Sequence, residues 1–336
     1  MSVRSTAAAP VRWGICGTGR MAATIAQELR GLGSAGAELL AVGSRTRSAA
    51  EDFAQRFGIP RAYASYADLA RDPRLDVVYI ATPPSLHAEN ALACLAARKA
   101  VLCEKPFALN ASEAMRMVRA AREQRVFLME AMWTRFLPAL AAVRAIVTAG
   151  TLGPLRLVTG GGGFVPHFDP QTPLFNRALG GGVLLDAGVY LVSLSSMLLG
   201  APLEVLAQGE LGASGVDEQE AILLRCARGA QALLYVSLKA RRSPDLEILG
   251  ETGRLRLEPP VFRPTRLTVT VGDAPPQVQE YPVEGSGYGP QLLEVMGALR
   301  QGRLESAVMP LAETVMVLRT MDAVRAALGL SYPQES

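Results

Sequence analysis

The chain has 336 residues, of which 49% are hydrophobic and 19% are charged. This composition excludes an intrinsically disordered protein, and the length indicates two domains with room for large cores. The 34 Lys and Arg residues against 31 Asp and Glu residues leave a net charge of +3. That charge is too small for a protein built mainly to bind nucleic acid, so we expect no nucleic-acid partner.

Cysteine, histidine and long apolar segments are scarce. The four cysteines and two histidines are too few and too scattered for a disulfide framework, a metal site or a histidine-centred triad. Residues 1–10 lack the apolar core of a secretory signal. The longest uncharged run, 187–203, has 17 residues, fewer than the roughly 20 of a spanning helix. We therefore expect a buried helix there, no metal, no membrane contact and a cytoplasmic location.

The first 130 residues alternate short apolar runs with helical patterns. Apolar strands without polar alternation are typical of a sheet that helices cover on both faces. The order therefore predicts a doubly wound parallel sheet of the Rossmann type, and we place the first domain at 1–130. The predicted strands are 11–16, 38–42, a short one near 63, 77–81 and 100–103, and the predicted helices are 21–32, 48–57, 66–71, 85–97 and one that starts after Asn110.

Strand patterns dominate after residue 130. They predict an α+β domain over 131–336 with an open, mostly antiparallel sheet. Helices cover one face of such a sheet, so the free face predicts a homodimer. We expect the last helix, 310–328, to be able to pack back on the first domain. The other predicted helices are 138–149, 181–199 and 290–301, and the strands are 155–159, 203–211, 219–226, 231–238, 245–249, 254–257, 266–271 and 277–283.

A glycine-rich segment with the pattern G-x-G-x-x-A joins the first predicted strand to the first helix. Gly17 permits a tight turn, Gly19 lets the backbone approach a pyrophosphate, and Ala22 lets the helix pack closely. The helix N-terminus supplies N–H donors. We therefore predict dinucleotide binding, and the alternative is a glycine-rich turn without a ligand. The predicted binding residues are Gly17, Thr18, Gly19, Arg20 and Met21.

The end of the second predicted strand favours NADP. The segment after Gly43 has no acidic residue of the kind that binds the ribose 2′-hydroxyl of NAD. The hydroxyl of Ser44 and the guanidinium of Arg45 suit a 2′-phosphate instead. The alternative is a solvated surface position, and this fits Arg47 better than Arg45.

Two later segments carry candidate catalytic groups. Lys105 follows strand 100–103 directly, at the carboxyl edge of the sheet, where open α/β sheets bind ligands. Asp186 and Tyr190 are four residues apart in an apolar helical run, so they share a face, and the lone Asp needs a partner. Each has an ordinary alternative: a surface charge for Lys105, a structural role for Asp186 and a core position for Tyr190.

Five motifs together resemble the glucose–fructose oxidoreductase/inositol dehydrogenase/MocA (Gfo/Idh/MocA) family. Many members have His where Tyr190 stands. Tyrosine there, with the run Trp-Thr-Arg-Phe, resembles the branch of dimeric dihydrodiol dehydrogenases and NADP-dependent D-xylose dehydrogenases. The motifs are RWGICGTGR at 12–20, ATPP at 81–84, EKP at 104–106, EAMWTRF at 130–136 and GGVLLDAGVY at 181–190.

The resemblance implies a role for each matched position. Lys105 and Tyr190 would flank the substrate carbon, with Asp186 beside them. The glycine-rich run 160–163 departs from what we expect of this family's pocket wall. His167 lies in a loop near the predicted pocket; we expect an ordinary loop histidine, and the alternative is a contact with the substrate. The remaining expected contacts are Thr82, Pro83, His87, Glu104 and Lys105 at the cofactor, and Trp133, Phe164, Asp186, Tyr190 and Tyr288 at the substrate.

The resemblance predicts an NADP-dependent oxidoreductase that moves a hydride between nicotinamide and a carbon of a sugar, polyol or dihydrodiol. Tyr190 would be the acid/base, and the Lys105 ammonium would lower its pKa from about 10 and stabilise alkoxide charge. Asp186 would orient the substrate hydroxyl or Lys105. The alternatives are a non-catalytic NAD(P)-binding regulator and an NAD-dependent enzyme that uses transient oxidation.

Overall fold

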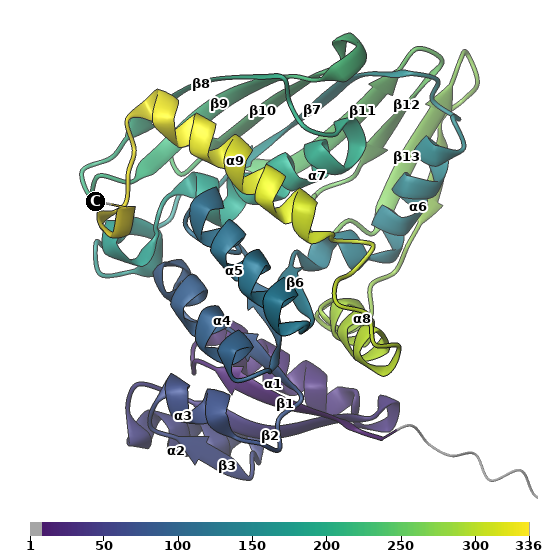
Figure 1. Cartoon of the computed structure of the whole chain (residues 1–336). Helices are drawn as coiled ribbons and strands as arrows, with labels where there is room; N and C mark the ends of the chain where they lie inside the picture. Colours follow the sequence, from purple (N-terminus) through teal and green to yellow (C-terminus); the bar gives the residue numbers. More distant parts are fainter. Residues whose placement is uncertain (1–8, 336) are drawn as a thin grey trace, which may run out of the picture.

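The structure is a computed structural model that describes residues 9–335, and two sheets dominate it (Figure 1). The first is a six-stranded parallel sheet in the order β3-β2-β1-β4-β5-β6. Its elements are β1 Val11–Cys16, α1 Arg20–Gly31, β2 Ala37–Gly43, α2 Arg47–Phe57, β3 Arg61–Tyr63, α3 Tyr66–Arg71, β4 Val77–Ile80, α4 His87–Ala96, β5 Ala100–Glu104, α5 Ala111–Gln124 and β6 Leu128–Ala131.

Burial explains why these strands read as unbroken apolar runs. Every residue of β4, β5 and β6 is buried, because helices cover both faces of the sheet. The predicted doubly wound Rossmann architecture is confirmed. The strand order reverses between β1 and β4, and ligands bind at such a switch point outside the carboxyl ends of the strands.

Strand β6 is an element that the sequence analysis does not assign. Its four residues include Glu130, which is buried and whose pKa is raised by that burial to about 7. A charged residue at a fully buried position hides the strand from a search for apolar runs. The chain continues from β6 directly into a short turn, Trp133–Phe136, that reaches the second half of the protein.

The second sheet has eight strands in the order β14-β13-β12-β11-β7-β10-β9-β8. Strands β7 and β10 pair in parallel and the other neighbours pair antiparallel, as predicted for a mostly antiparallel sheet. Its elements are α6 Pro138–Thr148, β7 Leu155–Gly163, a π-helical turn Leu184–Gly188, α7 Val189–Leu199, β8 Glu204–Leu211, β9 Asp217–Arg225, β10 Gln231–Ser237, β11 Arg242–Gly250, β12 Gly253–Leu257, β13 Arg266–Val271, β14 Gln277–Glu280, α8 Gly289–Arg300 and α9 Leu311–Leu328.

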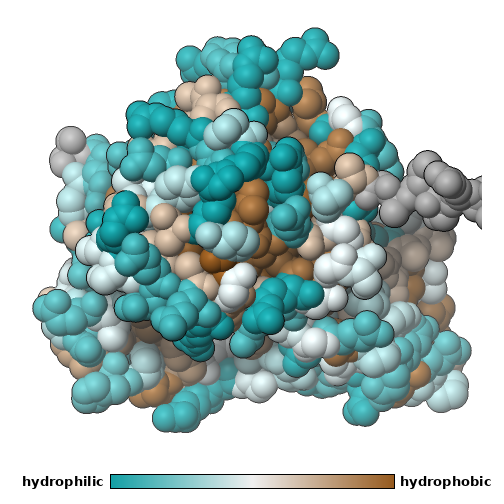
Figure 2. All heavy atoms as spheres, turned by 90° about the horizontal axis from the view of Figure 1, so that it is seen from below, coloured by the Kyte–Doolittle hydropathy of each residue, from teal (hydrophilic) through white to brown (hydrophobic). Residues whose placement is uncertain are grey.

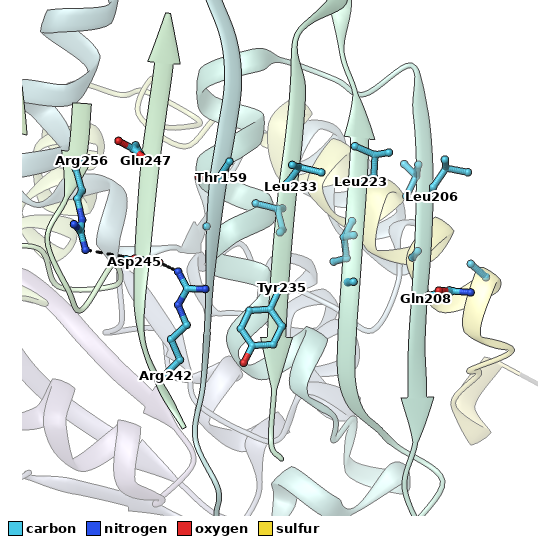
Figure 3. A pocket seen from close by; sticks show the side chains of 17 residues that line it. Thr159, Leu206, Gln208, Leu223, Leu233, Tyr235, Arg242, Asp245, Glu247 and Arg256 are labelled. Atoms are coloured by element: carbon cyan, nitrogen blue, oxygen red, sulfur yellow. Dashed lines mark hydrogen bonds and ion pairs between the residues drawn. The ribbon is translucent and has the colours of Figure 1, made fainter. Parts of the chain in front are cut away.

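The two faces of this sheet differ. Helices α7 and α9 pack on one face, and within the described residues no helix covers the opposite face (Figures 1 and 3). On that open face the side chains of Leu206, Leu223 and Leu233 project from three neighbouring strands, with α9 behind the sheet (Figure 3). Leu206 is 54% exposed and Leu233 is 46% exposed.

Helix α9 contacts both halves of the protein. It packs against α5 of the first half and against α7 and β8 of the second. The carboxylate of Asp322 in α9 accepts a hydrogen bond from the Ala111 amide at the start of α5, at 2.9 Å. One helical stretch, Arg177–Leu199, is long and apolar enough to cross a membrane, but 67% of its most apolar part is buried inside the protein. It is a core helix by position.

Candidate active site

A cavity of about 1290 Å³ lies between the carboxyl edge of the parallel sheet and the second half of the protein. Seen from below, the surface is mostly polar, with apolar residues exposed in a central hollow (Figure 2). All the predicted cofactor and substrate residues line the cavity, so the fold brings them together. They are Gly17, Thr18, Gly19, Arg20, Met21, Ser44, Arg45, Thr82, Pro83, His87, Glu104, Lys105, Trp133, Phe164, Asp186, Tyr190 and Tyr288.

The glycine loop leaves room for a phosphate group. Gly17 has φ +116°, and a Cβ there would lie 2.8 Å from the Ala81 carbonyl oxygen at the end of β4, so a side chain does not fit. At Gly19 an added Cβ would meet nothing within 4 Å. No side chain caps the N-terminus of α1, and its first turn has no acidic residue. These features fit a dinucleotide pyrophosphate.

The end of β2 supplies cationic and hydroxyl groups to the same cavity. Ser44 is buried, whereas Arg45 is exposed and forms no ion pair with any residue of 9–335. Arg47 instead pairs with Glu51 one helical turn later, at 3.4 Å on the surface. Tyr66 also lines the cavity beside Arg45, and the sequence analysis does not include it. Arg45 is therefore bonded to the Tyr66 hydroxyl but is not paired with a carboxylate among residues 9–335.

His87 ties two strand ends together at the floor of the cavity. The ring is buried, with Nδ1 2.8 Å from the Pro106 carbonyl oxygen and Nε2 2.8 Å from the Thr82 carbonyl oxygen. Burial lowers the pKa of His87. A neutral ring donates to only one of these two carbonyls. The geometry fixes the segments next to Thr82 and Lys105, while direct cofactor contact by His87 remains a prediction.

Glu104 places a buried carboxyl group under Lys105. It accepts hydrogen bonds from the Tyr79 hydroxyl and, at 3.1 Å, from the Lys105 backbone amide. Burial raises the pKa of Glu104 to about 6. A carboxyl with that pKa is mostly ionised at neutral pH, so it adds negative charge behind the ammonium of Lys105.

Lys105, Asp186 and Tyr190 converge from two segments far apart in the chain. Lys105 Nζ donates to the Asp186 carbonyl oxygen at 2.7 Å and lies 3.3 Å from Asp186 Oδ1. The same Nζ lies 5.0 Å from the centre of the Tyr190 ring. Burial lowers the pKa of Lys105, but the negative charges of Tyr190 when it is ionised, of Asp186 and of Glu104 outweigh burial and raise this pKa above its ordinary value. Lys105 is therefore an ammonium directed at the phenol.

The protonation of Tyr190 requires a correction to the sequence analysis. Burial raises the pKa of Tyr190 above the ordinary value of a phenol. This rise is larger than the lowering of the pKa by the Lys105 charge and by the hydrogen bond from Trp133. The Trp133 indole Nε1 donates to the Tyr190 oxygen at 3.0 Å. Because an indole is only a donor, the Tyr190 oxygen accepts here and its own proton points elsewhere. Tyr190 is thus the protonated form at neutral pH.

The segment that carries Asp186 and Tyr190 is wound differently from the prediction. Residues Leu184–Gly188 form a π-helical turn, and the α-helix starts at Val189. Such turns are rare and frequent at functional sites. The Asp186 side chain is 51% exposed and faces the cavity rather than the core. Its ion pair with Lys105 provides the partner that we predicted for a lone acidic residue in an apolar run.

Aromatic side chains next to Tyr190 form one wall of the cavity. Trp133 stacks on Tyr288 with ring centres 4.4 Å apart, and the Tyr288 hydroxyl lies 3.9 Å from the Met21 sulfur of the glycine loop. Phe262, whose ring centre lies 6.0 Å from that of Tyr190, also lines the cavity. The sequence analysis misses Phe262. The signal was an aromatic residue inside the proline-rich loop between β12 and β13.

The glycine run 160–163 belongs to β7 and serves strand packing. A Cβ at Gly161 would overlap the Tyr235 ring, and one at Gly162 would overlap Pro244. The run thus lets β10 and the start of β11 approach β7 closely. Phe164 directly after it lines the cavity and is 40% exposed. His167 is exposed and does not line the cavity.

The arrangement can move a proton beside a bound dinucleotide. It combines a loop for phosphate, an ammonium, a phenol and a carboxylate around one space. Within residues 9–335 no three His, Cys, Asp or Glu side chains are grouped closely enough to hold a metal ion. The four cysteines are buried and unpaired.

Two family models match this chain. Residues 11–132 match the model of an oxidoreductase family with an NAD-binding Rossmann fold, and residues 140–256 match the GFO/IDH/MocA C-terminal domain. The chain is 39% identical to the trans-1,2-dihydrobenzene-1,2-diol dehydrogenase of Mus musculus and 36% identical to that of Homo sapiens. Both similarities cover 97% of this chain and 99% of the relative.

Solved structures give the same picture of the fold. The aldose-aldose oxidoreductase of Caulobacter crescentus has a TM-score of 0.86 at 26% identity, covering 95% of this chain and 97% of that chain. A 3-ketoreductase of Actinomadura kijaniata, in complex with NADP and TDP-benzene, has a TM-score of 0.82 at 27% identity, covering 95% and 98%. A levoglucosan dehydrogenase complexed with NADH and L-sorbose has a TM-score of 0.87 at 21% identity, covering 96% and 97%, a likeness of fold.

Proposed function

Because this chain belongs to the Gfo/Idh/MocA oxidoreductase family and is a dehydrogenase that acts on CH–OH groups, we propose that it is NADP-dependent and uses Tyr190 as its acid/base. One observation carries the proposal. Lys105, Asp186 and Tyr190 meet in the same cavity as the glycine loop, with Lys105 Nζ bonded to Asp186 and directed at the Tyr190 ring.

The chain's own residues would handle the proton. When bound, the nicotinamide supplies the hydride acceptor or donor. In carbonyl reduction the protonated Tyr190 would give its proton to the substrate oxygen, and in alcohol oxidation the Tyr190 phenolate, whose fraction grows with pH, would take the hydroxyl proton. The Lys105 ammonium would stabilise developing negative charge on the substrate oxygen. Asp186, which is exposed to the cavity, would orient Lys105 and a neighbouring substrate hydroxyl.

The guanidinium of Arg45 at the end of β2 supports NADP over NAD. Arg45 lines the cavity beside Ser44 and Tyr66 and has no carboxylate to pair with among the described residues. A guanidinium is well suited to bind a phosphate through two hydrogen bonds and to stack on a flat base. The neighbouring Arg47 is already paired with Glu51 at the surface.

The aromatic wall supports a small cyclic substrate with neighbouring hydroxyl groups. Trp133, Tyr288 and Phe262 offer flat apolar faces to the cavity, while Lys105 and Asp186 offer polar groups to it. A dihydrodiol, an aldose or an inositol presents one apolar ring face and vicinal hydroxyls. Relatives named as trans-1,2-dihydrobenzene-1,2-diol dehydrogenases over nearly the full chain favour the dihydrodiol.

The open face of the eight-stranded sheet supports a homodimer. Leu206, Leu223 and Leu233 form an apolar centre, and Arg242, which pairs with Asp245 at 2.9 Å, lies toward one edge of the face (Figure 3). A second copy would meet this face through a two-fold axis. We further propose a division of labour in which residues 1–130 bind NADP and residues 131–336 bind substrate and the partner, in a cytoplasmic enzyme.

An NADP⁺ reduction screen tests the proposal. The purified protein is assayed with trans-dihydrodiols, aldoses and inositols, each with NADP⁺ and again with NAD⁺. We expect NADPH formation with at least one class and a lower kcat/KM with NAD⁺. Tight NADP binding without any reduction would instead support the non-catalytic regulator, and a reversed cofactor preference would overturn the role of Arg45.

A further inference from the structure

Two acidic side chains are buried side by side outside the cavity, at the start of β9. Asp217 and Glu220 are both fully buried, and neither lines the active site. Residues three apart on a regular strand face opposite sides. Here the register shifts opposite Glu210 and Leu211, so β9 has one extra residue and both carboxyl groups point inward.

Asp217 binds the start of the helical segment that carries the catalytic groups. Its Oδ2 accepts a hydrogen bond from the Leu184 amide at 2.6 Å, and the Val183 amide also reaches this carboxylate. Leu184 opens the π-helical turn, which contains Asp186 and leads to Tyr190. A carboxylate at a helix N-terminus satisfies free amides and interacts favourably with the helix dipole.

The Asp217 side chain lies so close to the backbone that only glycine fits at position 182. Gly182, immediately before the two amides, has φ +118°, and a Cβ there would overlap Asp217 Oδ1. On the other side of the same segment, the Tyr332 hydroxyl donates to the Gly181 carbonyl oxygen at 2.8 Å. The chain entering the catalytic helix is thus fixed by β9 on one side and by the C-terminal segment on the other.

The buried carboxyl groups of Asp217 and Glu220 share one proton. No donor from the described residues reaches Asp217 Oδ1 or either carboxyl oxygen of Glu220. Two adjacent carboxyl groups can bond to each other only when one is protonated. Asp217 receives the backbone amides, so it keeps the charge. Burial and that charge raise the pKa of Glu220, which keeps the proton.

The other ionisable groups near Asp217 and Glu220 are already bonded to other partners. Arg325 lies over the Tyr332 ring at 5.0 Å and is bonded to Asp322 at 2.7 Å and to Glu335 at 2.8 Å. Tyr332 donates its only hydroxyl proton to Gly181. Among residues 9–335, the buried Asp217 charge is therefore balanced by the backbone amides of Leu184, Val183 and Asp217 itself and by the proton on the neighbouring carboxyl.

We propose that Asp217 is a positioning residue for the reaction: its carboxylate fixes the first turn of the segment that holds Asp186 and Tyr190 against Lys105. This inference rests on the proposed function, because the catalytic roles of Asp186 and Tyr190 are assigned there. Asp217 touches no substrate or cofactor space, so it acts through the backbone of residues 183–184.

Three variants test the proposal. Asp217→Ala leaves the amides unpaired and should lower kcat about 10- to 100-fold, with the NADP Kd changed less than about twofold. Asp217→Asn is the conservative rescue, because its amide oxygen can accept from Leu184 and its NH₂ can donate to Glu220. It should keep kcat within about threefold. Glu220→Gln mimics the protonated partner and should do the same.

A stability measurement tests the shared proton without any turnover. A raised pKa for Glu220 means that the folded protein keeps a proton that the unfolded chain releases above about pH 4.3. Stability then falls as pH rises. Between about pH 5 and pH 8 the Tm of the wild type should fall relative to that of Glu220→Gln. Parallel Tm curves would overturn the shared proton.

The outcomes separate this proposal from the proposed function. If the wild type turns over and Asp217→Ala lowers only Tm, with kcat unchanged at temperatures well below Tm, the positioning role is wrong and the function stands. If Asp217→Ala does not fold, Asp217→Asn and Glu220→Gln decide: a large loss of kcat in Glu220→Gln at unchanged Tm would overturn the proposal. A wild type without turnover in the NADP⁺ screen would remove the function and, with it, the positioning role.

Discussion

The two ends of the cavity are built in different ways. At the cofactor end, the binding groups are consecutive residues at strand ends, 17–21 after β1 and 44–45 after β2. At the substrate end, Lys105, Trp133 and Tyr190 come from separate segments and meet only because the two sheets pack together. A contiguous loop sets the first end, whereas long-range packing sets the second. Substitutions at the two ends should therefore affect different measurements.

The largest expected effect is at the substrate end. Tyr190→Phe removes the acid/base but keeps the ring beside Lys105 and Phe262. We expect kcat to fall by about 10²-fold or more, while the NADP Kd stays within about twofold. Steady-state kinetics and a fluorescence titration of NADP measure the two quantities. Retained kcat would remove Tyr190 from the chemistry, and a large rise in Kd would show that the two ends are not separate.

The next effect is at the cofactor end. Arg45→Ala should lower kcat/KM for NADP by about 10- to 100-fold, because a hydrogen bond to a charged group contributes roughly 1.5–3 kcal/mol. The value for NAD should change little, since NAD has no 2′-phosphate. Arg47→Ala is the matched control, because Arg47 pairs with Glu51 at the surface and should leave both values unchanged. Equal losses with both cofactors would contradict the assignment.

A smaller effect tests the tuning of Tyr190 by Trp133. Trp133→Phe removes the indole donor to the Tyr190 oxygen, which favours the deprotonated phenol. Its loss, of about 0.5–1.5 kcal/mol, should raise the pKa of Tyr190 by up to about one unit. In the proposed alcohol oxidation the Tyr190 phenolate is the base, so the rising limb of the kcat–pH profile should move to higher pH. Activity at pH 7 should fall about 3- to 10-fold.

A control separates this tuning from a packing defect. Tyr288→Phe keeps the ring that stacks on Trp133 and changes no bond to Tyr190, so its pH profile should match that of the wild type. A Trp133→Phe profile that is lower at every pH without any shift would indicate lost packing and would argue against the hydrogen bond as the cause.

The smallest effect on turnover is expected from the open sheet face. The double variant Leu206→Asp/Leu233→Asp places charges in the apolar centre and should convert a dimer to a monomer. Sedimentation analysis measures this, and kcat should remain within about twofold because the face lies away from the cavity. Leu304→Asp, an exposed position outside the sheet, should leave the assembly unchanged. A wild type that is monomeric at micromolar concentration would end the dimer proposal.

The cofactor end could be predicted because its signals are local. The glycine spacing, the missing acid after Gly43 and the apolar strands are visible in short windows, and the structure has the corresponding turn and sheet. At the substrate end, Lys105 and Tyr190 entered through a resemblance to known motifs, since nothing in their spacing brings them together. Their contact, like the bond between Lys105 and Asp186, joins segments far apart in the chain and depends on how the two halves pack.

The features that the sequence analysis did not predict have physical causes. Phe262 lies in a loop whose path depends on strands β12 and β13, so no periodic pattern marks it. Strand β6 contains buried Glu130, and the expectation of a lowered Tyr190 pKa left out the cost of burying the phenolate. Burial is a property of the whole fold, and a sequence window does not contain it.

Helix α9 has a consequence for how the protein is made. It is the last long element of the chain, yet it covers β8 and α7, and its Asp322 completes the start of α5. During synthesis, which proceeds from the N-terminus, these apolar surfaces stay uncovered until α9 itself has left the ribosome. A polypeptide interrupted shortly before Leu311 would thus be aggregation-prone, even though every residue that lines the catalytic cavity had already been translated.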